Sequence, residues 1–220
     1  MNDKKTSIAE VLNFVNSFHE QCRNMVRDAV RLLRDDHQIF LSHGKTWDYT
    51  NKPNDRFLDQ DYSMIRRTWS IFIPSGEIVR GACFNFEFFR PNYQMSPALI
   101  YGAASPGNKG FSELGRWTHF YTTEDAEKGG QNIKLDQDGP IAVVTGTMPR
   151  QFEESAFVRV PLEAITDQGA LLRMVVSPLA ALLKGNRSEA IQLLSNVPTE
   201  LWPSGQPAVE TDEQNDSETA

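Results

Sequence analysis

The sequence predicts an α+β fold in which a mainly antiparallel, curved β-sheet of about five to seven strands packs against helices. Apolar residues near the N-terminus recur every three or four positions, those in the middle alternate, and those near the C-terminus return to helical spacing. No helix of crossover length separates the alternating segments, which favours antiparallel neighbours. We therefore expect a long N-terminal amphipathic helix and several C-terminal helices on one face of the sheet.

The first helix is expected over residues 7–35. Ser7 and Glu10 form a capping box, in which each side chain can bind an amide of the first turn. Apolar residues then follow at alternating spacings of three and four: Ile8, Val11, Val15, Phe18, Cys22, Met25, Ala29 and Leu32. Leu12, Val26 and Leu33 widen this stripe. A wide stripe is typical of a helix packed on a sheet, and pairing between the helices of two chains is the alternative.

The sheet region is expected over residues 38–163. In the third strand Phe84, Phe86 and Phe88 share one face, which gives the sheet a strongly apolar side. Pro74-Ser75-Gly76 indicates a tight turn between the second and third strands. The predicted strands are rich in β-branched or aromatic residues and lie at 38–43, 67–73, 78–90, 98–103, 115–123, 140–147 and 156–163.

Helices return over residues 167–196, and these close a single domain expected at 1–203. Asp167 can cap a helix at 168–177, Pro178 can start a second piece that ends at Lys184-Gly185, and 187–195 forms a third. Residues 204–220 carry five carboxylates and neither Lys nor Arg, so we expect a disordered acidic tail.

Charge and composition exclude several classes of function. The formal net charge is −7, but without the tail the chain holds 24 acidic against 22 basic residues, so no nucleic-acid partner is expected. The apolar runs are far shorter than a bilayer span, and the N-terminus lacks a secretory signal, so we expect a soluble cytoplasmic protein without a membrane partner. Cys22 and Cys83 are expected to be reduced core thiols.

The sequence contains no local signature of catalysis or of metal binding. The carboxylate pairs in Asp59-Gln60-Asp61 and Asp136-Gln137-Asp138 do not continue into a calcium loop, and no Gly-x-Ser-x-Gly elbow is present. We therefore expect no metal and no cofactor, and the leading hypothesis is a non-catalytic module that binds a protein or a small ligand.

Aromatic and cationic residues mark the candidate ligand site. On a strand, Trp117, His119 and Tyr121 share one face that could stack against a planar ligand, and His43 and Arg67 could add positive charge. A protein partner is the other hypothesis, including a second copy paired through helix 7–35. The alternative function is a small hydrolase or transferase that uses His119 or His43 as general base.

Overall fold

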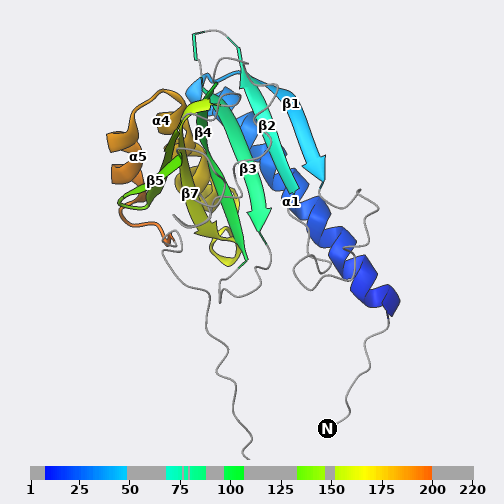
Figure 1. The fold of residues 1–220 in the computed structure, drawn as a ribbon. Helices are drawn as coiled ribbons and strands as arrows, with labels where there is room; N and C mark the ends of the chain where they lie inside the picture. Colours follow the sequence, from blue (N-terminus) through cyan, green and yellow to red (C-terminus); the bar gives the residue numbers. More distant parts are fainter. Residues whose placement is uncertain are drawn as a thin grey trace, which may run out of the picture.

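A computed structural model describes residues 8–48, 68–75, 77–78, 80–87, 97–106, 133–146 and 152–199 (Figure 1). It confirms the α+β class: a long helix, then seven strands, then several helical segments. The helical segments are α1 (Ile8–His37), η5 (Leu162–Ala164), α3 (Gln168–Leu171), η6 (Leu172–Val176), α4 (Ser177–Leu183) and α5 (Arg187–Leu194). The strands are β1 (Leu41–Asp48), β2 (Thr68–Pro74), β3 (Gly81–Glu87), β4 (Ala98–Pro106), β5 (Ile133–Asp138), β6 (Ile141–Gly146) and β7 (Phe152–Pro161).

The described strands form one open antiparallel sheet in the order β1-β2-β3-β4-β7-β6-β5. The β2–β3 hairpin predicted from Pro74-Ser75-Gly76 is present, with Phe72 opposite Ala82. The first strand begins later than the predicted 38–43, because the chain needs residues 38–40 to turn away from α1. The predicted strand at 115–123 lies outside the described residues.

One strand was not predicted. β5 covers the Asp136-Gln137-Asp138 segment and pairs with β6 through a two-residue turn. Gly139 in that turn has φ of 58°, as a tight two-residue hairpin requires at its first central position. β5 is an edge strand and carries charged residues, which is how edge strands avoid pairing with other chains. Its sequence was not recognised as a strand, because only Ile133 and Leu135 are apolar and the other residues are polar or charged.

The helices cover one face of the sheet, and the apolar core lies between the two layers (Figure 1). From the sheet, Phe84 and Phe86 contribute as the sequence predicted. From α1, the buried positions begin at Cys22, which belongs to the predicted stripe. Nearer the N-terminus α1 extends past the ends of the strands, and there Phe14 is 69% exposed and stacks on Phe18 with ring centroids 6.2 Å apart. Self-association through this helix stays a prediction.

The two helices expected on either side of Pro178 are one continuous helix. Proline has no amide hydrogen, so the carbonyl of Met174, four residues earlier, loses its usual donor. The chain responds with a stretch of wider π-type turns at η6, where the amide of Ser177 donates to the carbonyl of Leu172. Tyr101, from β4, donates its hydroxyl to the Met174 carbonyl at 2.7 Å. A hydroxyl from the sheet therefore replaces the missing amide.

The helix ends follow the expected capping chemistry. Gly185 ends α4 with φ of 78°, and the amides of Gly185 and Asn186 donate to the carbonyls of Leu182 and Ala181 in a Schellman motif. The side chain of Asn186 then accepts a hydrogen bond from the amide of Glu189, so Asn186 caps α5. These caps fix the angle between the last two helices.

Asp167 should make stability depend on pH in acid. Its side chain accepts the amide of Ala170, and this hydrogen bond to the start of α3 holds the pKa of the carboxyl below its ordinary value. Because the folded pKa is lower than the unfolded one, the stabilisation is complete above the unfolded value and is lost as pH falls through the folded one. We expect Asp167→Asn to lower Tm at pH 7, and the difference from the native chain to shrink below about pH 4.

The charge-matched control is Asp136→Asn, on the exposed edge strand β5. A difference in Tm between the native chain and Asp167→Asn that stays constant from pH 7 to pH 3 would contradict the capping role of the ionised carboxylate.

Candidate functional site

The site begins where α1 ends and the chain reverses into β1. Gln38 has φ of 58°, in the left-handed region, which turns the backbone sharply after His37. The amide of Ile39 then donates to the carbonyl of Leu33 at 3.0 Å, and the Ile39 side chain is buried in the core. This reversal places Phe40 and Leu41 beside the last turns of α1.

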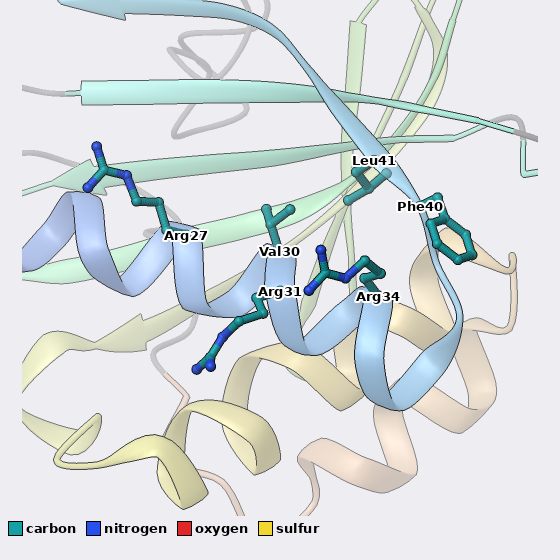
Figure 2. A pocket seen from close by; sticks show the side chains of 6 residues that line it. All are labelled: Arg27, Val30, Arg31, Arg34, Phe40 and Leu41. Carbon is teal, nitrogen blue, oxygen red and sulfur yellow. The ribbon is translucent and has the colours of Figure 1, made fainter.

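A hollow of about 320 Å³ lies between these turns and the start of β1. Three arginines and three apolar residues line it: Arg27, Val30, Arg31, Arg34, Phe40 and Leu41. We call this hollow the arginine groove. Figure 2 shows Val30 projecting from α1 toward Leu41, with the guanidinium groups of Arg27 and Arg34 on either side of Val30, while Arg31 points away from them.

The arginines of the groove have weak partners. Arg34 donates to the carboxylate of Asp35 at 2.7 Å, and this hydrogen bond lowers the pKa of Asp35. Arg31 pairs with Asp28 at 3.1 Å, and both side chains are about half exposed. Arg27 donates to the side-chain oxygen of Asn24, which is neutral. Exposed pairs of this kind are screened by water and salt, so an incoming anion can replace them at low cost.

The apolar side of the groove is held in place by the sheet. Phe40 is 51% exposed, yet its backbone is fixed, because the amide and the hydroxyl of Ser75 both donate to its carbonyl at 3.0 Å. Val30 and Leu41 are half-buried and pack against the core. An exposed aromatic ring on a fixed backbone, beside arginines, is a common composition of protein-binding surfaces.

The residues that the sequence singled out are not brought together by the described structure. His43 lies in β1 with its backbone opposite Phe72, and its side chain is not described. Trp117, His119, Tyr121 and Arg67 lie outside the described residues. The aromatic ligand site therefore stays a prediction.

A second polar feature lies on the face of the sheet opposite the helices. Asn85 and Arg159 are both buried and are aligned across Ile100, in the order β3, β4, β7. Among the described residues the amide of Asn85 has no hydrogen-bond partner, which is costly inside a protein. This face is thus buried as well, although the alternating pattern indicated only one strongly apolar side.

The two cysteines are free and buried, as the sequence suggested. Burial raises the pKa of the Cys22 thiol to about 11 and that of Cys83 to about 12. Both therefore stay protonated at neutral pH, and a thiol is a poor nucleophile. Neither cysteine is placed for catalysis.

The arginine groove was missed from the sequence. Its one local signal is the spacing of Arg27, Arg31 and Arg34, since residues at i, i+4 and i+7 share a helix face. Arginines on the polar face of an amphipathic helix usually only contact solvent. The groove exists because the left-handed turn at Gln38 folds Phe40 back onto that face, and no sequence pattern predicts this turn.

Across the described ranges no cluster of His, Cys, Asp and Glu could hold a metal ion. Likewise, no helix in that part of the chain combines the length and apolarity needed to span a bilayer. Comparison with protein-family models, with curated proteins and with solved structures finds no match to this chain. Function is therefore inferred from the site itself.

Proposed function

We propose that this chain is a non-catalytic interaction module that binds an acidic peptide segment of a protein partner in the arginine groove. One observation carries the proposal: Arg27 and Arg34 flank Val30, and Leu41 and the exposed Phe40 continue this apolar floor past Arg34. Cations around an apolar floor suit a peptide that carries both carboxylates and an apolar side chain.

The spacing of the two arginines suits an extended peptide. Arg27 and Arg34 are seven residues apart on one helix, which corresponds to a rise of roughly 10.5 Å. In an extended polyproline II conformation, residues three positions apart lie on the same side of the chain and are separated by about 9 Å. Two carboxylates at i and i+3 can therefore reach both guanidinium groups. Each guanidinium offers two parallel donors to a carboxylate, a geometry that lysine does not provide.

The apolar floor would add selectivity for sequence. Val30 lies between the two guanidinium groups, and Leu41 lies on the Phe40 side of the Arg34 guanidinium, so an apolar side chain between or beside the two carboxylates would contact this floor. Phe40 offers a further aromatic surface at one end of the groove. An acidic segment with an apolar residue inside it should bind more tightly than a purely polar one, because the apolar contact is removed from water.

Charge reversal in the groove tests the proposal. We expect Arg27→Glu combined with Arg34→Glu to weaken binding of a fluorescein-labelled peptide, Gly-Ser-Glu-Leu-Ser-Glu-Ser-Gly, by about tenfold or more at low salt. The affinity is measured by fluorescence anisotropy on the full chain. The peptide places two glutamates three positions apart around a leucine.

The matched control is Arg173→Glu, an exposed cation on η6, and it is compared with the single variant Arg34→Glu. This control changes the net charge equally but leaves the groove intact, so its affinity should stay close to that of the native chain. Equal losses in the Arg34→Glu and Arg173→Glu chains would mean that the peptide senses only net charge, and the groove would not be the binding site.

A further inference from the structure

We propose that the chain's own C-terminal segment, residues 204–220, competes with the partner for the arginine groove. This inference rests on the proposed function, because it concerns the occupancy of the same site. The occupant is the stretch from Val209 to Asp216, and its carboxylates bind the guanidinium groups of Arg27 and Arg34. The module would then be autoinhibited until a partner segment displaces the stretch.

Charge is the first argument. Residues 204–220 hold five carboxylates and no Lys or Arg, whereas the rest of the chain is almost neutral. The groove presents arginines whose described partners are either neutral or exposed carboxylates on the same helix. Because this acidic segment belongs to the same chain, its carboxylates are always available to these arginines.

The spacing of the carboxylates in this segment also matches the spacing of the arginines in the groove. Glu210 and Glu213 are three positions apart, and so are Glu213 and Asp216. In a polyproline II conformation the two carboxylates of each pair would lie on the same side of the chain about 9 Å apart, against the rise of roughly 10.5 Å between Arg27 and Arg34. Val209 lies outside both pairs, directly before Glu210, so its apolar side chain would contact the groove at the end formed by Leu41 and Phe40.

The C-terminal segment is also long enough to reach the groove. Burial and, after it, the nearby charge of Lys184 lower the pKa of His37 at the end of α1, and Glu189 acts on it in the opposite direction, so the start of α5 lies close to the groove end of α1. Val197 donates its amide to the carbonyl of Leu194, which keeps the chain against α5 beyond the helix. From Thr199 to Glu213 the chain can extend by about 46 Å, whereas a domain of about 190 residues has a radius of gyration of roughly 16 Å.

Tethering strengthens the competition. A segment linked to its site acts at an effective concentration in the millimolar range, so even weak ion pairs can occupy the groove for much of the time. Because exposed charges are screened by salt, this occupancy should fall at high ionic strength.

Neutralising the acidic segment tests the inference. The variant carries Glu210→Gln, Asp212→Asn, Glu213→Gln, Asp216→Asn and Glu218→Gln in the full chain. We expect it to bind the fluorescein-labelled peptide about threefold or more tightly than the native chain at low salt. In the Arg27→Glu, Arg34→Glu background, the same neutralisation should change the affinity very little, because the groove no longer attracts either segment.

The outcomes separate the two proposals. If the peptide binds through the groove arginines but equally well with and without the five carboxylates, the competition is wrong and the binding function stands. If peptide binding is independent of Arg27 and Arg34 in both backgrounds, the binding function is wrong and the competition with it. A gain from neutralisation that persists in the Arg→Glu background would also overturn the competition, since the effect would not come from the groove.

A second measurement detects the contact directly. A spin label is attached through Ser217→Cys, and the native thiols of Cys22 and Cys83 should not react because they are buried and protonated. We expect the label to broaden the amide signals of residues 27–41 at low salt, and the broadening to disappear in the Arg27→Glu, Arg34→Glu variant. Unbroadened signals at low salt would refute the contact.

Discussion

Replacing Gly102 with alanine is expected to lower the free energy of unfolding by about 3 kcal/mol or more. Gly102 lies in the middle of β4, directly opposite Phe157 of β7. An added Cβ would lie 2.6 Å from Cδ1 of Phe157 and would also overlap the backbone carbonyl of Ala156. The ring could rotate away, but the carbonyl belongs to the neighbouring strand of the sheet. The β4–β7 pairing would therefore have to shift.

The control for this prediction is Gly139→Ala, the same substitution in the β5–β6 turn. There the nearest atom to an added Cβ is 3.8 Å away, and the cost comes only from the positive φ, about 1 kcal/mol. Urea denaturation followed by circular dichroism measures both variants. A Gly102→Ala chain as stable as the Gly139→Ala chain would show that β4 and β7 are not packed as described.

Replacing Tyr101 with phenylalanine is expected to cost about 2 kcal/mol, because it leaves the Met174 carbonyl buried without a hydrogen bond. Tyr101 is fully buried, and burial raises the pKa of its hydroxyl well above the ordinary value, so the group stays protonated and donates. The substitution removes one oxygen and leaves the ring, so the loss reports on the hydrogen bond rather than on packing.

Pro178→Ala provides the matched background, because it restores an amide four residues after Met174. In that background the helix can supply its own donor, so Tyr101→Phe should cost clearly less than in the native chain. The comparison is a double-mutant cycle in urea. Equal costs in both backgrounds would contradict the view that the tyrosine hydroxyl replaces the amide that proline lacks.

The elements that the sequence predicted well are those set by local chemistry. The long N-terminal helix follows from the spacing of its apolar residues, and most of the stripe from Cys22 onward is indeed buried. The start of α3 follows from Asp167 and the end of α4 from Gly185, which act through caps within a few residues. Local patterns predict such features because the interacting groups are neighbours in the chain.

The features that were missed depend on contacts between distant segments. A break was expected at Pro178, but Tyr101 satisfies the carbonyl that proline leaves open, so the helix continues. Pairing with β6 makes 133–138 a strand although four of its six residues are polar or charged. The arginine groove needs both the helix face and the turn at Gln38, which brings Phe40 onto it.

The proposed function requires that an acidic segment bind between α1 and β1. A titration of the ¹⁵N-labelled chain with the Gly-Ser-Glu-Leu-Ser-Glu-Ser-Gly peptide, followed by amide chemical shifts, tests it most directly. We predict saturable shifts concentrated at residues 27–41 that vanish in 0.5 M NaCl. Shifts confined to other parts of the chain, or none at millimolar peptide, would contradict it.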